Sequence, residues 1–180
     1  MILIFERFNF SEDEQKKIVE SLVIIVDTRE KKNEHILSYF EKHKIKYVKK
    51  ALKCGDYSFY IEQNNELSIP RDIYFDDEII IERKNSLEEL SSNFTVSRTR
   101  FEEEFSTTLA NNKYLLIENA NYSDICDNNY DTKYNNKSFL GSIHSFNHKF
   151  GLQVVFIPDN KYTPIYILGT FKYYLKGLIK

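Results

Sequence analysis

The sequence is poor in the residues that mark secreted, membrane and metal-thiolate proteins. Its 180 residues include no tryptophan, one methionine and two cysteines. Cys54 and Cys126 lack metal-ligand spacing and give no disulfide framework, which indicates a reduced, intracellular protein. The apolar start Met1 to Phe5 is too short for a signal peptide, and no apolar run approaches the roughly 20 residues that span a bilayer.

Charge of one sign is also lacking, because the formal net charge is −2. This value does not indicate a nucleic-acid-binding protein, but the 25 basic residues can still cluster on one surface. A lysine-rich stretch is either a rim that binds phosphates or a solvated surface; it comprises Lys42, Lys44, Lys46, Lys49, Lys50 and Lys53. His144 and His148 lie one helical turn apart, yet without a third ligand a structural role is the simpler interpretation.

The order of apolar patterns predicts an α/β fold in one domain covering residues 1–180, with an extension 1–21, a core 22–157 and a final helix 162–179. Ser11 and Glu14 form a capping box, as do Ser86 and Glu89, so each pair predicts the start of a helix. The other expected helices cover residues 31–43, 98–110 and 138–150. The expected strands cover residues 22–26, 47–48, 57–62, 67–75, 78–84, 114–118 and 152–157, and residues 119–136 read as a polar loop.

The richest chemistry lies in Gly55-Asp56-Tyr57 and Ile79-Ile80-Ile81-Glu82-Arg83-Lys84. Side chains alternate along a strand, so Glu82 and Lys84 share one face while Arg83 points to the other. Two carboxylates brought together repel each other unless a cation lies between them, and Mg²⁺ prefers such oxygen ligands. A solvated strand end is the competing interpretation, and for an isolated Glu-x-Lys it is the more common one.

Further acidic and basic groups occur near this pair. Glu88 lies one helical turn after Lys84 and could return to the same cleft. Asp27, Arg29 and Glu30 follow the first buried strand, at the kind of strand end where open α/β sheets place their sites. Taken alone, this group fits a salt-bridged loop better than a catalytic element.

Together these motifs resemble the XPF-type nuclease domain of the PD-(D/E)xK superfamily. Val26 to Glu30, Gly55 to Tyr57 and Ile81 to Glu88 occur in the order of that family. The pattern continues with Arg98-Thr99-Arg100-Phe101 and Leu115-Leu116-Ile117-Glu118, so it spans roughly residues 22–157. The resemblance implies a restriction-endonuclease-like α/β fold with a central mixed sheet flanked by helices.

The resemblance also implies a Mg²⁺-dependent endonuclease that hydrolyses DNA phosphodiesters, with Mn²⁺ able to replace Mg²⁺. Asp56, Glu82 and the backbone carbonyl of Arg83 are then expected to bind the metal, and Lys84 to activate a water. The full implied catalytic set is Asp27, Arg29, Glu30, Asp56, Glu82, Lys84 and Glu88. The side chains expected to bind DNA are those of Lys53, Arg83, Arg98 and Arg100.

This chain departs from the family in two respects. Glu88 stands where the family usually has Asp, and the Gly-rich hairpins of the C-terminal helix-hairpin-helix domain are missing. We therefore expect a stand-alone form of phage or prokaryotic type, in the cytoplasm of a bacterium or a phage-infected host cell. Branched, forked or flapped DNA is the expected substrate, in recombination, repair or phage DNA processing.

Two alternatives to this function remain open from the sequence: a catalytically inactive DNA-binding scaffold and a nuclease that acts on RNA. The final helix carries an apolar stripe whose members are Ile165, Leu168, Phe171, Leu175 and Leu178. This stripe either packs on the sheet or forms a homodimer interface, as in other XPF-type domains.

Overall fold

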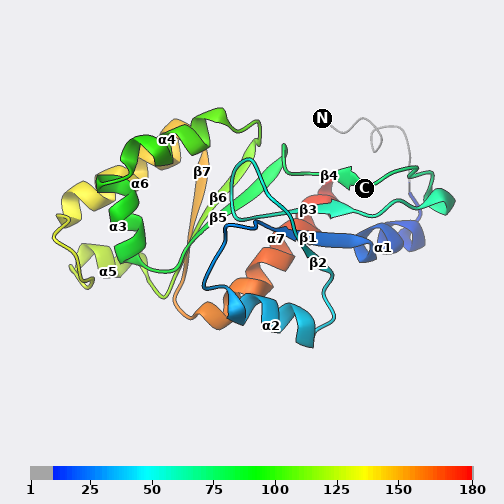
Figure 1. The fold of residues 1–180 in the computed structure, drawn as a ribbon, viewed down its shortest axis with the longest axis horizontal. Coiled ribbons are helices and arrows are strands. Elements are labelled where there is room, and N and C mark those ends of the chain that lie inside the picture. Colours follow the sequence, from blue (N-terminus) through cyan, green and yellow to red (C-terminus); the bar gives the residue numbers. More distant parts are fainter. Residues whose placement is uncertain (1–9, 180) are drawn as a thin grey trace.

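A seven-stranded mixed sheet forms the centre of the protein, as the computed structural model of residues 10–179 shows (Figure 1). The expectation for Met1 to Phe5 lies outside the described residues. The strands are β1 (Leu22–Val26), β2 (Tyr47–Lys49), β3 (Tyr57–Ile61), β4 (Ile73–Tyr74), β5 (Ile79–Lys84), β6 (Asn112–Glu118) and β7 (Leu152–Ile157). Their order is β2-β1-β3-β5-β6-β7, with β4 paired to the outer part of β3.

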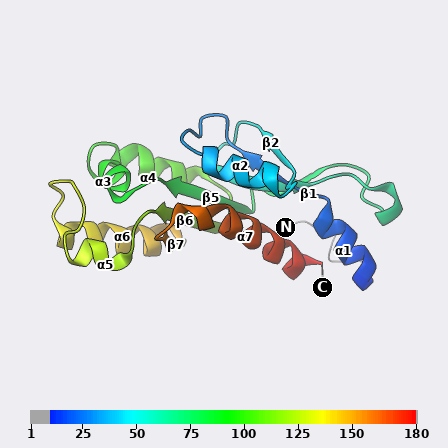
Figure 2. The same ribbon diagram turned by 90° about the horizontal axis from the view of Figure 1, so that it is seen from below.

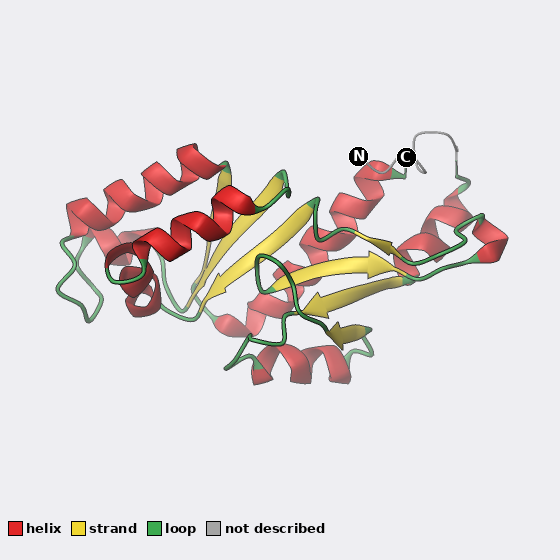
Figure 3. Cartoon of the chain, turned by 45° about the horizontal axis from the view of Figure 1, so that its top comes forward, coloured by secondary structure: helices red, strands yellow, loops and turns green. Residues whose placement is uncertain are grey.

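The direction of pairing changes at β3. This strand runs antiparallel to both β1 and β5, whereas β1–β2, β5–β6 and β6–β7 are parallel pairs. Only Tyr57 and Ile81 are in register between β3 and β5, so the two strands meet at one end and then splay apart (Figure 3). The mixed sheet with flanking helices confirms the predicted fold class.

Helices cover both faces of the sheet (Figure 2). They are α1 (Glu12–Glu20), α2 (Glu34–Lys42), α3 (Leu87–Thr95), α4 (Arg98–Thr107), α5 (Tyr122–Cys126), α6 (Asn136–Phe150) and α7 (Thr163–Leu178). Helices α2 and α7 pack against each other on one face, while α3, α4 and α6 gather on the other face over β5–β7.

The side chains of the buried strands point alternately to the two faces of the sheet and so contribute to two hydrophobic cores. Leu116 of β6 belongs to the core under α2 and α7, whereas its neighbours Leu115 and Ile117 belong to the core under α3, α4 and α6. Because successive side chains point to opposite faces, one buried strand supplies both layers. The continuous apolar runs in the sequence therefore mark strands that are covered on both sides.

Most elements lie where the sequence predicts them, but three regions differ. The strand expected over 67–75 is wrong: Asn65–Leu67 form a 3₁₀ turn capped by Asn64, and β4 keeps only two residues. The polar loop 119–136 contains the short helix α5, begun by an Asn121–Asp124 capping box. Helix α4 ends at Thr107, before residue 110.

Helix α7 buries a different stripe from the one expected. Ile167, Phe171 and Leu175 are fully buried against the sheet, whereas Ile165 and Leu178 are exposed. Of the predicted stripe, Phe171 and Leu175 are core residues and Leu168 is partly buried against them. No described helix is both long and apolar enough to cross a membrane.

Truncation of a core side chain on α7 tests this packing. Phe171→Ala removes a fully buried ring that lies 5.2 Å from the ring of Phe59, centroid to centroid. We expect the free energy of unfolding to fall by about 3–5 kcal/mol. The exposed Val96, which follows α3, provides the control, since Val96→Ala should change the free energy of unfolding by less than about 0.5 kcal/mol. Urea denaturation of both variants measures the difference, and equal effects would show that α7 is packed differently.

Candidate active site

Strand β5 delivers the central residues of the site. Glu82 and Lys84 are on the face that carries α3 and α4, and their side chains are joined by a hydrogen bond from Lys84 Nζ to Glu82 Oε1 of 2.7 Å. Both residues are buried. The Lys84 ammonium also lies 4.8 Å from the centre of the Phe101 ring of α4. Alternation along the strand thus places the Glu82 carboxylate and the Lys84 ammonium together, as the sequence predicts.

Asp56 joins this pair from the start of β3. Its backbone is tied to both neighbouring strands, because Asp56 N–H donates to Ile81 O at 2.9 Å and Asp27 N–H donates to Asp56 O at 2.8 Å. Its carboxylate Oδ2 accepts a hydrogen bond from Arg83 N–H at 2.7 Å. These contacts fix the carboxylate of Asp56 beside the end of β5.

Gly55 makes this approach possible. Its φ angle is +76°, in the left-handed region, and an added Cβ would lie 3.0 Å from Ile80 Cβ. Any side chain here would have both a strained backbone and a clash with β5. The Gly-Asp step in the sequence therefore has a steric cause.

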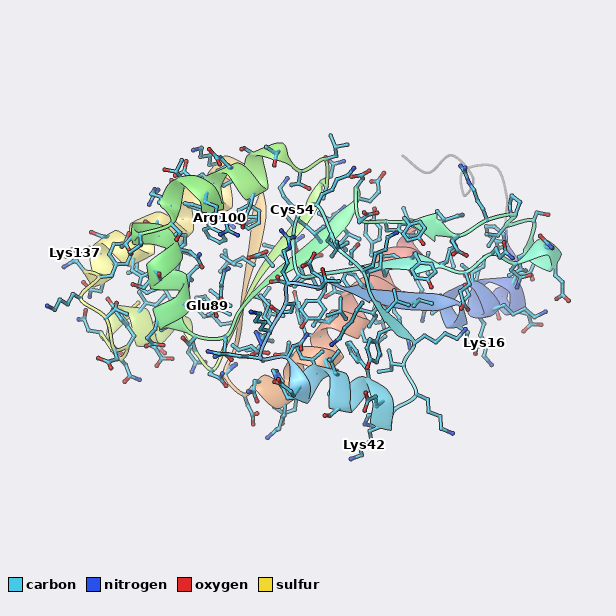
Figure 4. All side chains as sticks on the ribbon, viewed as in Figure 1. Lys16, Lys42, Cys54, Glu89, Arg100 and Lys137 are labelled. Atoms are coloured by element: carbon cyan, nitrogen blue, oxygen red, sulfur yellow. The ribbon has the colours of Figure 1, made fainter. Side chains whose placement is uncertain are left out.

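Asp56, Glu82 and Lys84 line a polar cleft of about 250 Å³. Figure 4 labels Cys54 and Arg100, which line this cleft, and Glu89 of α3. The other lining residues come from the loop after β1, the loop before β3, and the segment that contains α3 and α4; they are Arg29, Lys53, Cys54, Gly55, Asn93, Ser97, Arg100, Phe101 and Glu104.

The carboxylates in the cleft are held in unfavourable surroundings. Burial raises the pKa of Asp56 well above its usual value, and the charges of Glu82 and Glu30 raise it further. Burial also raises the pKa of Glu82, in spite of the nearby ammonium. Burial disfavours the Lys84 ammonium, but Glu82 and Asp56 outweigh this effect and raise the pKa of Lys84. In this state Lys84 is a proton-bearing cation.

These residues suit a hard divalent cation. Among residues 10–179, neither Asp56 Oδ1 nor Glu82 Oε2 takes part in a hydrogen bond, so each carboxylate keeps an oxygen for a ligand. The described residues contain no cluster of three or more His, Cys, Asp or Glu side chains arranged around one ion. Mg²⁺ fits such a two-carboxylate site, because it commonly keeps several waters and takes its other ligands from substrate phosphates.

Asp27 and Arg29 hold the loop that leads to Asp56. Asp27 is buried, and its two carboxylate oxygens accept hydrogen bonds from Arg29 N–H, Arg29 Nε–H and Leu52 N–H at 2.7, 2.9 and 2.6 Å. Arg29 Nη2 in turn donates to Leu52 O at 2.9 Å. Burial raises the pKa of Asp27, but these hydrogen bonds outweigh it and hold the pKa below its usual value. Asp27 is thus fully occupied as a clamp on the loop.

Arg83 and Glu30 meet on the opposite face of the sheet. The Arg83 side chain is 2% exposed; it lies 3.3 Å from Glu30 and donates to Lys32 O at 2.7 Å. Glu118, at the end of β6, lies 3.6 Å from Arg83 Nε and 2.9 Å from His35 Nε2. The prediction that the Arg83 side chain binds DNA is wrong for this structure, because its guanidinium is enclosed. Metal binding by its backbone carbonyl stays a prediction.

Glu88 does not reach the cleft, which corrects a second expectation. Its carboxylate turns to the loop before α6 and accepts a hydrogen bond from Asp131 N–H at 3.0 Å. Glu89 takes the place nearest to the site: its Oε1 lies 4.0 Å from Lys84 Nζ, and its Oε2 accepts from Asn85 N–H at 3.0 Å. Ser86 caps α3 and so sets which of the two acids faces Lys84.

Of the other basic side chains predicted to bind DNA, two line the cleft and one lies outside it. Lys53 and Arg100 line the cleft and are largely exposed, each near one acid, Asp77 and Glu104 respectively. Arg98 instead packs between α4 and α6, where it donates to Glu102 and Ser142 at 2.9 Å each. The predicted DNA contact of Arg98 therefore has no place in this cleft.

Comparison with known proteins decides the family. The sequence model described as the ERCC4 domain matches residues 26–168. This chain belongs to the ERCC4 domain family. The match covers every predicted catalytic residue and the start of α7, and it confirms the resemblance to XPF-type nuclease domains. Comparison with curated proteins gives no match.

Two solved structures share the ERCC4 domain fold. XPF from Aeropyrum pernix matches with a TM-score of 0.58 and 20% identity over 84% of this chain and 61% of that chain. XPF from Aeropyrum pernix in complex with DNA matches with a TM-score of 0.59 and 18% identity over 86% of this chain and 66% of that chain. This chain therefore spans about three fifths to two thirds of the length of those chains.

Several residues that line the ERCC4 cleft or approach Lys84 beside it cannot be identified from the sequence alone. Glu89, Asn93 and Glu104 have no motif of their own among the many polar residues of α3 and α4. Helical spacing is the only available signal, because Glu89 and Asn93 are four residues apart and so share one face of α3. Helical spacing shows that two residues share a face of α3, but it does not show what that face contacts. Only the structure shows that this face lies beside the end of β5.

The clamp role of Asp27 predicts a specific pH dependence. An amide cannot accept hydrogen bonds on both sides, so Asp27→Asn should lower the free energy of unfolding by about 2 kcal/mol at neutral pH. The folded pKa of Asp27 is lowered, so its stabilisation is present above the unfolded pKa of about 3.9 and is lost as pH falls through the folded pKa.

Urea unfolding between pH 7 and pH 2.5 measures this difference. The gap between wild type and Asp27→Asn should narrow below about pH 4. The exposed Asp127 gives a control, since Asp127→Asn should stay within about 0.5 kcal/mol of wild type. A gap that is constant over the whole range would contradict the clamp.

Proposed function

We propose that this ERCC4 domain is a divalent-metal-dependent endonuclease that hydrolyses phosphodiester bonds of structured DNA. The observation that carries the proposal is the convergence of Asp56, Glu82 and Lys84 in one polar cleft. Two carboxylates with raised pKa values beside a buried ammonium destabilise the folded state. Such groups cluster at functional sites, so their presence in a cleft supports a catalytic role.

In the proposed reaction, a water attacks the phosphorus of the scissile phosphodiester. A new oxygen–phosphorus bond forms and the bond to one sugar oxygen breaks. One proton of the water ends on the departing sugar oxygen and the other on the new phosphate monoester or in solvent. Asp56 and Glu82 would hold Mg²⁺ or Mn²⁺, which supplies positive charge to the phosphate and lowers the pKa of bound water.

Lys84 and the loop residues have supporting roles in this scheme. As an ammonium, Lys84 can orient the water and neutralise charge on the phosphate, but it has no lone pair with which to take a proton. Its expected role as the base stays a prediction that requires a lower pKa than this arrangement produces. Asp27 and Arg29 keep Asp56 in place through Leu52, and Glu30 does the same for β5 through Arg83.

The rim of the cleft supports a nucleic-acid substrate. Lys53, Arg29 and Arg100 are exposed cations around an acidic floor, so they can contact phosphates on either side of the cut. XPF from Aeropyrum pernix, of the same fold, has been solved in complex with DNA. A preference for branched, forked or flapped DNA is part of the proposal, in recombination, repair or phage DNA processing.

Cleavage of a labelled substrate panel tests the proposal. The panel contains forked, flapped, single-stranded and duplex DNA, with RNA counterparts, in Mg²⁺ or Mn²⁺. We expect cutting of structured DNA and a loss of more than about 100-fold in Asp56→Ala and Lys84→Ala, with binding retained. Binding without cutting across the whole panel would point to an inactive scaffold, and cutting of RNA alone would point to a ribonuclease.

The two neighbouring glutamates of α3 form a matched pair for a second test. Glu89 is 4.0 Å from Lys84 Nζ, whereas Glu88 binds Asp131 N–H. Glu89→Gln should therefore slow cleavage by about tenfold, because it removes one charge that positions the ammonium. Glu88→Gln should cleave at the wild-type rate. The reverse order of these two rates would place Glu88 in the working site.

We also propose that the chain pairs with a second copy through α7. Ile165, Tyr173 and Leu178 are exposed on this helix, while its other face is buried on the sheet. Sedimentation at micromolar concentration measures the mass directly. A monomer under these conditions would remove the homodimer from the proposal and leave the cleavage chemistry unaffected.

A further inference from the structure

One buried polar atom in the cleft has no partner. Asn93 lies on α3 and lines the same cleft as Asp56, Glu82 and Lys84. Its side-chain oxygen Oδ1 is enclosed, and no hydrogen-bond donor reaches it within residues 10–179. A buried acceptor without a donor lowers stability, so its presence in a functional cleft calls for an explanation.

The surroundings of Asn93 limit what that donor can be. Lys84 Nζ donates to Glu82, and Arg100 Nε donates to Glu104. Phosphodiester oxygens carry no proton at neutral pH and so cannot donate to a carbonyl oxygen. Water is the smallest donor that enters such a cleft with DNA, and a small shift of the cleft wall around Asn93 would let one reach this oxygen, of which less than 1 Å² is exposed.

We propose that Asn93 is a catalytic residue whose Oδ1 accepts a hydrogen bond from the attacking water. This inference rests on the proposed nuclease function. The amide takes no proton, because it is too weak a base; it fixes the direction in which the water presents its lone pair to the phosphorus. The Lys84 ammonium, which lines the same cleft, supplies positive charge near the phosphate.

The position of Asn93 on α3 fits this role. Asn93 lines the cleft and Glu89, four residues earlier on the same face of α3, lies 4.0 Å from Lys84 Nζ, while Leu90 and Phe94 are buried in the core. The helix is anchored by these apolar neighbours, so the amide is held on a rigid element. Rigid placement is what an orienting group requires.

Replacement by leucine separates catalysis from stability. Asn93→Leu has nearly the same shape and removes the unpartnered acceptor. We expect kcat to fall roughly 10- to 100-fold with little change in KM, and the Tm to equal or exceed that of wild type. Asn93→Ser, whose hydroxyl accepts a hydrogen bond and leaves room for a water, should recover part of the rate.

The exposed neighbour Ser92 supplies the control, and Ser92→Leu should leave kcat, KM and Tm unchanged. Three results would overturn the inference. Wild-type cleavage by Asn93→Leu would show that the oxygen holds no reacting water. A clear drop in the Tm of Asn93→Leu would show a structural acceptor. A rate loss confined to RNA substrates would assign the donor to the ribose hydroxyl.

A wild-type chain that cuts nothing in the panel is a different outcome. It contradicts the proposed function itself, and the inference about Asn93 fails with it. An active wild type combined with an active Asn93→Leu rejects only the inference. The two failures are therefore distinguishable in one set of assays.

Discussion

The alternation of side chains along β5 is the constraint on which the rest of the site depends. Three successive residues of one buried strand, Glu82, Arg83 and Lys84, are sent to two faces. The outer two meet in the cleft, while Arg83 is fixed by Glu30 on the far face. A shift of the strand by one residue would exchange these positions and place the Arg83 guanidinium in the cleft beside Asp56. The ion pairs of Arg83 behind the sheet therefore maintain the register of the cleft.

The other parts of the site bring a second carboxylate to that strand. Asp27 clamps Arg29 and Leu52, the loop then passes the tight Gly55, and Asp56 arrives beside Arg83 N–H. Burial holds the pKa values of Asp56 and Glu82 above their usual values. The fold thus uses hydrogen bonds at Asp27 and leaves acceptor oxygens free at Asp56 and Glu82. The acidic residues thus divide into a clamp, Asp27, and the pair proposed to bind the metal, Asp56 and Glu82.

The sequence was sufficient to predict what depends on local period and on motif order. The triple-isoleucine run and the Gly-Asp step identified β5, β3 and the central triad, and the capping boxes located α1 and α3. Side-chain positions that depend on tertiary packing could not be predicted from the sequence. Glu88 and Glu89 are adjacent acids, and the exact turn after Ser86 decides which one approaches Lys84. The enclosure of Arg83 and the inward turn of Arg98 depend on Glu118 and Ser142, which are distant in sequence.

The most direct test of this account is a metal titration followed by thermal unfolding. A cation that binds only the folded chain raises its stability in proportion to occupancy. Wild-type protein at neutral pH should gain thermal stability with millimolar Mg²⁺ or Mn²⁺. Asp56→Asn should start from a higher Tm, because it removes a carboxylate whose raised pKa costs stability above that pKa, and should gain little with metal. An equal metal-induced rise in both proteins would contradict the claim that Asp56 and Glu82 form the metal site.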